Sequence, residues 1–291
     1  MSERARPWQR GATPYLYVGP AVLLLVAVVF YPLAYAFLLT FQEFKLTGAA
    51  RKFVGFANYA HLFQDPLVGL SLLRSLVFAG GLVSLCFVLA MAFALILNER
   101  FVGRRLVRAL ILVPWSVSGI INGLMWKGMY SPSFGVVNDL LVNKLHILKH
   151  YVSWLQDFPM LSLILAQSWK MMPFIALLLL AGLQAISQDL YEAAKIDGAG
   201  YLRRFVSITI PSLRSIALVA IIILTIDSLK VFAIVDVLTK GGPANMTLVL
   251  DYYVYKTAFN YLDMGYGSTL AYLLTSVILV FVVFYRRLMT R

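Results

Sequence analysis

Six long apolar stretches follow one another along the chain, and segments that carry charges, glycine and proline separate them. A helix needs about 20 mostly apolar residues to cross a bilayer, and an open sheet edge is not viable in lipid. We therefore predict an all-α, polytopic membrane protein with one membrane domain, 15–291, after an N-terminal tail, 1–14. Its six transmembrane helices are expected at about residues 15–39, 73–97, 107–129, 160–182, 213–237 and 266–285.

The first apolar stretch follows basic residues, as the core of a signal peptide does. It is longer than the usual core of such a peptide, and five further stretches come after it. We therefore expect it to be retained as a helix.

The composition agrees with a bilayer environment. Hydrophobic residues make up 61% of the chain and charged residues 13%, whereas soluble proteins have about 45–50% and about 25%. The single cysteine, Cys86, lies in an apolar run, which excludes an intrachain disulfide and favours a packing role.

The distribution of basic residues predicts the orientation. If the N-terminus is cytoplasmic, the inner segments hold fourteen Lys and Arg residues and the outer segments nine, with five and seven acidic residues respectively. Cytoplasmic loops carry the excess of Lys and Arg in membrane proteins. We therefore predict that both termini are cytoplasmic, and we attribute the net charge of +12 to topology and anionic lipid rather than to nucleic-acid binding.

The widest inner segment, 183–212, has room for a folded feature. Good helix formers over 190–196 predict a short helix with Asp189 as its N-cap, and Gly198 can end it with a positive φ. A second helix is expected over 202–210, after which Pro211 begins the fifth span. These features also suit an ordinary interfacial hairpin, and spacing alone does not identify a partner.

The same segment resembles the EAA loop of permease subunits in binding-protein-dependent ABC importers. That family has roughly the pattern E-A-A-x-x-D-G-A followed by I-x-L-P, and Ile210 replaces the usual leucine here. The matching residues are Glu192, Ala193, Ala194, Asp197, Gly198, Ala199, Ile208 and Pro211. Further stretches at 225–232, 237–243, 255–259 and 265–268 are similar to carbohydrate-class permeases.

The resemblance implies the type I ABC importer permease fold in a prokaryotic inner membrane. It implies a second homologous permease subunit, so that a heterodimer is expected, two ATPase subunits and an external solute-binding protein. The EAA loop would form a coupling helix that docks on one ATPase. No G-x-x-x-x-G-K-[ST] motif occurs in this chain, so we expect no cofactor and no enzyme activity here, with ATP and Mg²⁺ bound by the partner ATPase.

Polar residues inside the predicted spans are candidates for the substrate pathway, because a buried ionisable group must face protein or water. Two of them, Asp227 and Lys230, would also neutralise each other at i and i+3. A stripe at i, i+3 and i+7 in the third span suits a polyol but equally suits a helix-packing face. The candidates are Trp115, Ser118, Asn122, Lys170, Asp227 and Lys230.

The resemblance favours import of a di- or oligosaccharide, with glycerol-3-phosphate or another polyol as the alternative. Other ABC permease classes, for phosphate, amino acids or peptides, remain open as well. A membrane-embedded enzyme would need clustered acids or histidines near a membrane face. Apart from Asp236 at the very end of the fifth, the predicted spans contain one aspartate, Asp227, and no histidine, which disfavours that class.

Overall fold

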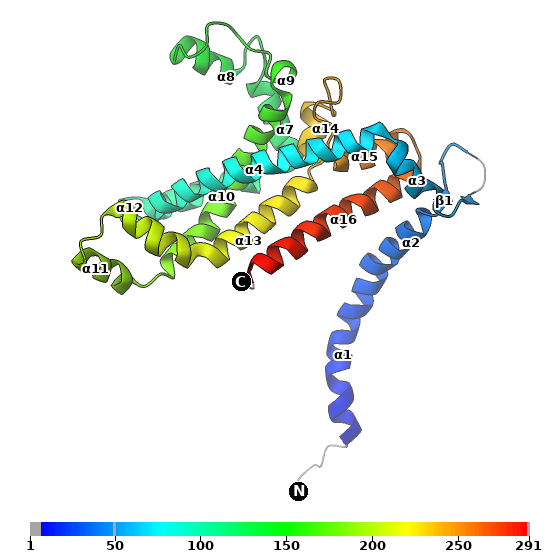
Figure 1. Cartoon of the computed structure of the whole chain (residues 1–291), viewed down its shortest axis with the longest axis horizontal. Helices are drawn as coiled ribbons and strands as arrows, with labels where there is room; N and C mark the ends of the chain where they lie inside the picture. Colours follow the sequence, from blue (N-terminus) through cyan, green and yellow to red (C-terminus); the bar gives the residue numbers. More distant parts are fainter. Residues whose placement is uncertain (1–6, 49–50, 290–291) are drawn as a thin grey trace. The chain divides into compact units, whose positions relative to one another are not determined.

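The computed structural model of the chain describes residues 7–48 and 51–289 and consists mainly of helices (Figure 1). The chain divides into two compact units, of which the first holds the described residues up to Gln64 together with Val254–Tyr272. The second holds Asp65–Tyr253 and the described residues from Leu273 onward. The long C-terminal helix α16 (Met264–Met289) supplies residues to both units.

The first unit combines helices with a small antiparallel hairpin, in which Gln42 lies opposite Phe53. Lys45 and Asp263 form an ion pair of 3.9 Å, which joins the hairpin region to the segment before α16. Its elements are α1 (Pro7–Leu25), the π-helical turn η1 (Val26–Phe30), α2 (Tyr31–Leu39), β1 (Gln42–Glu43), β2 (Lys52–Phe53), α3 (Ala57–Gln64) and η4 (Lys256–Asn260).

The second unit is built around three long helices that pack side by side, α4 (Pro66–Asn98), α10 (Pro159–Gln184) and α13 (Ile210–Leu229) (Figure 1). Small buried residues on α4, among them Ala90 and Ala94, allow this close packing. Cys86 is also fully buried there, as its sequence context predicted.

Shorter elements surround these three helices. They are α5 (Arg104–Leu110), α6 (Val113–Ser116), α7 (Gly119–Met129), α8 (Val136–Asn138), the π-helical turn η2 (Asp139–Lys144), α9 (Trp154–Asp157), α11 (Gln188–Ile196), α12 (Tyr201–Arg204), the π-helical turn η3 (Phe205–Thr209), α14 (Ala233–Leu238) and α15 (Leu250–Tyr255).

Within the described residues, five helices are long and apolar enough to cross a membrane, and a bent pair brings the number to six if it counts as one span. The predicted all-α, polytopic class is confirmed, with five or six membrane-spanning helices. The five helices are Tyr17–Leu39, Pro66–Asn98, Pro159–Gln184, Tyr201–Leu229 and Met264–Leu288, and the pair is Arg104–Ser116 with Gly119–Met129.

The third apolar stretch is not the continuous helix that we predicted over 107–129. The chain bends by 95° between Ser116 and Gly119, because Val117 is extended and Ser118 caps the next helix, accepting a hydrogen bond of 3.4 Å from the Ile121 N–H. Broken spans of this kind occur where the freed backbone faces protein or a polar cavity rather than lipid.

The fifth stretch also differs from its predicted bounds of 213–237. The helix begins at Tyr201 and ends at Leu229, and α14 follows as a separate element. The predicted boundary at Pro211 is wrong, because α12, η3 and α13 form one run that passes through it.

A π-helical turn ends two residues before a proline in two of the membrane helices. Proline lacks an N–H, and its ring clashes with the carbonyl four residues earlier in a regular α-helix. The wider turn closes with i to i−5 bonds instead, from the Ile210 N–H to Phe205 O and from the Tyr31 N–H to Val26 O. Helices can therefore continue past Pro211 and Pro32.

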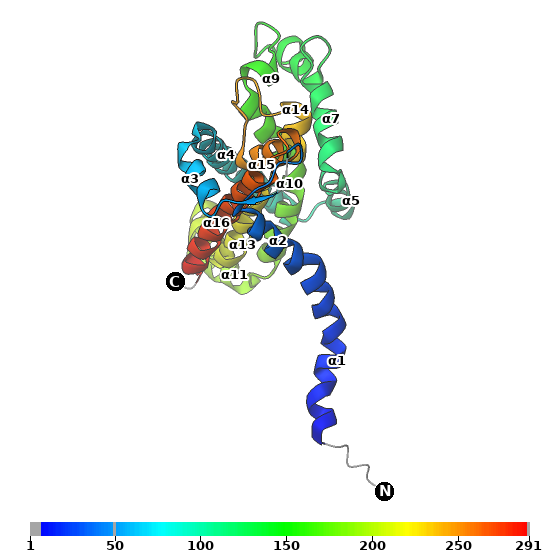
Figure 2. The same ribbon diagram turned by 90° about the vertical axis from the view of Figure 1, so that its right-hand side faces the viewer.

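Two glycines on α7 bring this helix close to α14 (Figure 2). A Cβ atom on Gly119 would lie 2.9 Å from Ala233 Cβ, and one on Gly123 would lie 2.8 Å from Val237 Cβ. The spacing is the small-xxx-small pattern of packed membrane helices.

We expect Gly123→Ala to destabilise the protein by about 1–3 kcal/mol through overpacking. Gly128 is the matched control, since it lies on the same helix and a Cβ atom added there would have no atom within 4 Å, and Gly128→Ala should stabilise by about 0.5–1 kcal/mol. Thermal unfolding of the purified protein compares the two variants. Equal midpoints would contradict the close α7–α14 contact.

Candidate functional site

The predicted coupling loop contains an exposed helix, α11, with a defined start. Its N-cap is Ser187 rather than the predicted Asp189, and the Ser187 Oγ accepts a hydrogen bond of 3.2 Å from the Asp189 N–H. The Ser187 hydroxyl also donates to Asp189 Oδ2 at 3.1 Å. Asp189 therefore lies in the first turn, where its negative charge suits the helix dipole.

The C-terminal end of α11 is a complete Schellman motif. Gly198 has a φ of +76°, its N–H donates to Lys195 O at 3.0 Å, and the Ala199 N–H donates to Ala194 O at 2.8 Å. This pair of bonds defines the motif and favours glycine at the left-handed position. The chain therefore turns sharply at a fixed point after Asp197, which is the C-cap.

One face of α11 is attached to the following membrane helix. The hydroxyl groups of Tyr191 and Thr209 share a hydrogen bond of 2.9 Å, and Thr209 is buried at the end of η3. A side-chain contact as well as the backbone therefore connects α11 to the helix that contains Pro211.

The other face of α11 is open. Glu192 and Ala193 are exposed, while Ala194 and Ala199 are half-buried. Ile196 has an exposed fraction of 86% and Leu190 of 51%, so apolar side chains stand beside the Glu192 carboxylate. A surface of this kind on a short, rigidly capped helix suits contact with another protein.

The candidate pathway residues do not form one stripe. Because of the break at Val117, Trp115 lies before the bend, where it stacks on Phe174 with ring centroids 5.2 Å apart. Ser118 serves as a helix cap, and Asn122 is fully buried and donates to Ala166 O at 3.3 Å.

A polar contact joins α10 and α13 instead. Gln167 Nε2 donates to Asp227 Oδ2 at 3.0 Å, and Lys170 is half-buried one turn along α10. No ion pair joins Asp227 and Lys230 among the described residues, because Lys230 is the exposed C-cap of α13 rather than a mid-span residue. Sequence reasoning did not single out Gln167 as the partner of Asp227.

Asp251, in the first turn of α15, is a titratable group that sequence reasoning did not single out. Burial raises the pKa of Asp251 to about 6, although the positive charge of Lys230 acts in the opposite direction. The ordinary pKa is 3.8. Between pH 3.8 and about 6, Asp251 is therefore protonated in the folded protein but ionised in the unfolded chain.

We therefore expect the stability of the protein to fall as the pH rises from about 4 to about 6, because the native state binds more protons in that window. Asp251→Asn should remove this component of the pH dependence. Thermal unfolding at pH 5 and pH 7.5 measures it in both proteins. An unchanged pH dependence in the variant would contradict the assignment.

The segment 130–159 folds around one buried amide. Asn138 Nδ2 donates to Val152 O at 2.9 Å, and Asn138 Oδ1 accepts from the Val152 N–H at 3.2 Å and from Trp154 Nε1 at 2.9 Å. Asn138 is fully buried. Its bonds join two residues that lie fourteen positions apart in the sequence and so hold the segment closed.

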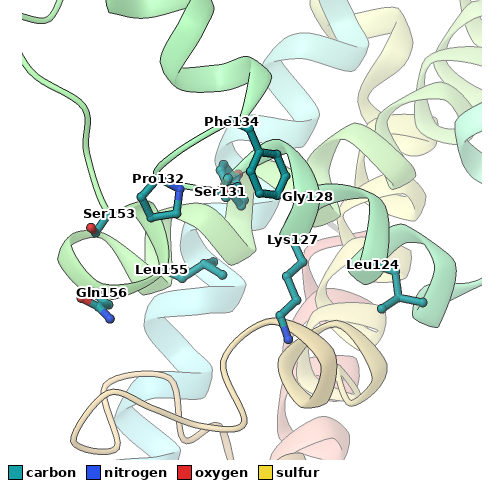
Figure 3. Close-up of a pocket in the computed structure, with 10 residues that line it drawn as sticks. Leu124, Lys127, Gly128, Ser131, Pro132, Phe134, Ser153, Leu155 and Gln156 are labelled. Atoms are coloured by element: carbon teal, nitrogen blue, oxygen red, sulfur yellow. The ribbon is translucent and has the colours of Figure 1, made fainter.

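A cavity of about 500 Å³ opens beside this segment. Figure 3 shows Leu124 and Lys127 of α7 on one side of it and Leu155 and Gln156 of α9 on the other. The lining is mostly apolar, with the Lys127 amine as its cationic group.

Comparison with known proteins identifies the family. Residues 86–291 match the family described as "Binding-protein-dependent transport system inner membrane component". The trehalose/maltose transport system permease protein MalF of Thermococcus litoralis is 39% identical over 276 residues, covering 93% of this chain and 91% of the relative. The sulfoquinovosyl glycerol transport system permease protein SmoG of Agrobacterium fabrum is 35% identical, covering 88% and 83% respectively.

The fold also matches a solved structure, that of a bacterial ABC transporter involved in the import of the acidic polysaccharide alginate. The TM-score is 0.81 at 23% identity, with 97% of this chain and 96% of the matched chain covered. These matches confirm the resemblance to ABC importer permeases, the multi-pass inner-membrane location and the role of a transport subunit rather than an enzyme. The chain belongs to the family of binding-protein-dependent transport system inner membrane components.

Proposed function

We propose that this chain is the permease subunit of an ATP-driven importer for a di- or oligosaccharide. The observation that carries the proposal is the 39% identity, over 93% of the chain, to a permease named for trehalose and maltose. A second relative, at 32% identity over 89% of the chain, is the trehalose transport system permease protein SugA of Mycobacterium tuberculosis. The chain forms half of the translocation pathway, and a second permease subunit supplies the other half.

In this proposal α11 is the helix that docks on a separate ATPase subunit. Its exposed face presents Glu192 and Ala193 to the partner, while the Gly198 turn and the Tyr191–Thr209 bond tie it to the fifth membrane helix. The mechanism requires a stiff connection between α11 and the membrane helices, because a flexible one would not transmit the movement that ATP binding produces.

In the proposed orientation, both termini, α11 and the end of α4 lie in the cytoplasm. The excess of Lys and Arg in the predicted inner segments supports it. The solute-binding protein then docks on the opposite side, where the 130–159 segment lies. Labelling of single cysteines at positions 192 and 144, in a Cys86→Ala background, tests the orientation by their access to a membrane-impermeant thiol reagent.

The proposed substrate pathway consists of the candidates that the sequence indicated. Trp115 is 44% exposed and stacks on Phe174, which offers an aromatic face for a sugar ring. Lys170 and the Gln167–Asp227 pair supply polar groups on α10 and α13. Lys230 is exposed at the end of α13. Ser118 caps α7 and the buried Asn122 bonds to Ala166 O, so these two residues would act by fixing the broken helix rather than by touching the sugar.

The test is reconstitution of the complete complex, with its ATPase subunits, second permease and binding protein, in proteoliposomes. Trehalose, maltose, longer maltodextrins and glycerol-3-phosphate are compared as stimulants of ATP hydrolysis. We expect one of the sugars to stimulate hydrolysis and to be taken up. Stimulation by glycerol-3-phosphate alone, or sugar transport by this chain without an ATPase, would overturn the proposal.

A further inference from the structure

A second cavity, of about 520 Å³, lies next to α11. It is lined by the end of α4, the end of α10 and the segment from α11 to η3. Its polar lining includes Asn98, Glu99, Arg100, Gln188, Lys195 and Arg204. Gln188, Tyr191 and Lys195 lie at i, i+3 and i+7, so one face of α11 lines the cavity, and Ala193 lies on the opposite face.

The charge around this cavity is unbalanced. Arg100, Lys195 and Arg204 line it, and Glu99 is the single acidic residue among the lining residues. None of these three basic side chains makes an ion pair or a side-chain hydrogen bond within the described part of the chain. The Nε atom of Arg204 is buried without a partner.

Like charges that line one cavity repel one another, and a buried donor without an acceptor is destabilising. A ligand with several anionic oxygens removes both penalties, since guanidinium groups bind phosphate through paired, charge-assisted hydrogen bonds. The Asn98 and Gln188 amides would add neutral donors. Basic pockets on the cytoplasmic side of membrane helices are known to hold anionic head groups.

We propose that this cavity is a binding site for a phosphate-bearing anion, whether the head group of an acidic phospholipid or a soluble phosphate compound. A phosphate there would contact the end of α4, α11 and α12 at once. It would therefore tie the coupling helix to α4 as well as to the fifth membrane helix, and it would stiffen the loop. This second step rests on the proposed coupling role of α11, whereas binding itself does not.

Binding is tested on the complete complex by native mass spectrometry. Phosphatidylglycerol, phosphatidylcholine and inorganic phosphate are each titrated against the wild type, Arg204→Gln and Arg203→Gln. Arg203 is the matched control, because it is the adjacent arginine, it is exposed and it does not line the cavity. Loss of the Arg204 charge removes no hydrogen bond seen among the described residues, so the variant should fold.

We expect retention of phosphatidylglycerol, with at least about tenfold weaker binding in Arg204→Gln and no change in Arg203→Gln, since tenfold corresponds to one lost contact of about 1.4 kcal/mol. Arg204-dependent binding of inorganic phosphate without lipid retention would assign the site to a soluble anion. Equal binding of every probe by all three proteins, or none, would overturn the site.

The consequence for coupling is measured separately, as solute-stimulated ATP hydrolysis in nanodiscs with and without phosphatidylglycerol. The wild type and Arg203→Gln should respond to the anion that binds, and Arg204→Gln should not. An identical response in all three proteins would overturn the stiffening role and leave the binding site intact. If no sugar stimulates hydrolysis in any lipid while binding persists, the proposed function fails rather than the site.

Discussion

Replacing Gly198 with proline is expected to reduce solute uptake by about tenfold or more, while membrane insertion stays at the wild-type level. Gly198 has a φ of +76°, whereas proline fixes φ near −65°. The substitution also removes the N–H that donates to Lys195 O. The Schellman turn therefore cannot form, and the direction of α11 relative to the fifth membrane helix is lost.

Gly200→Pro is the matched control for this experiment. Gly200 already has a φ of −65° and an extended ψ of 171°, so proline fits the native backbone there. Uptake and ATP hydrolysis are measured together in proteoliposomes for both variants. We expect Gly198→Pro to hydrolyse ATP without matching uptake and Gly200→Pro to resemble the wild type. Wild-type uptake in Gly198→Pro would count against a coupling role for this loop.

The geometry of the proposed coupling loop could be predicted from sequence because it depends on local residues. A left-handed residue at the end of a helix favours glycine for steric reasons, and Gly198 stands where the sequence placed it. The N-cap predicted at Asp189 is wrong, because Ser187, two residues earlier, is also a good capping residue. The structure selects Ser187, whose hydroxyl contacts both the backbone and the side chain of Asp189.

The break in the third apolar stretch could not be predicted from hydrophobicity, because both of its arms are apolar. The relevant contacts are tertiary, because Gly119 and Gly123 pack closely against Ala233 and Val237 on α14. Hydrophobicity along the chain carries no information about such contacts. The signal that could have revealed this was the G-x-x-x-G spacing itself, together with Ser118 as a capping residue directly before it.

The candidate pathway was predicted from residue types and only partly matches the contacts. Asp227 needed a partner, and i+3 pairing with Lys230 was reasonable if the helix continued to residue 237. Because the helix ends at Leu229, Lys230 points out of it and Gln167 from α10 takes the partner's place. A contact sixty residues apart in sequence cannot be read from helical spacing.

Replacing Asn138 with leucine is expected to destabilise the 130–159 segment by about 3 kcal/mol or more. Leucine is of similar size but leaves the Val152 N–H, the Val152 carbonyl and the Trp154 Nε1 without their partner. Each buried group left unsatisfied costs about 1–3 kcal/mol. Hydrogen exchange at the Val152 amide should therefore speed up by about a hundredfold or more, at 1.4 kcal/mol for each factor of ten.

Asn143→Leu is the control, since among the described residues the Asn143 amide bonds only to the exposed groups Asp139 Oδ1 and Tyr151 OH. Its effect should stay within about 0.5 kcal/mol, as for other surface positions.

The two regions tested, around Asn138 and Gly198, lie before and after α10, a helix of 26 residues and hence about 39 Å long. If the segment serves delivery of solute and the loop serves the ATPase, Asn138→Leu should lower uptake and solute-stimulated hydrolysis together, whereas Gly198→Pro should separate them. The same pattern in both variants would contradict this division between the two ends of α10.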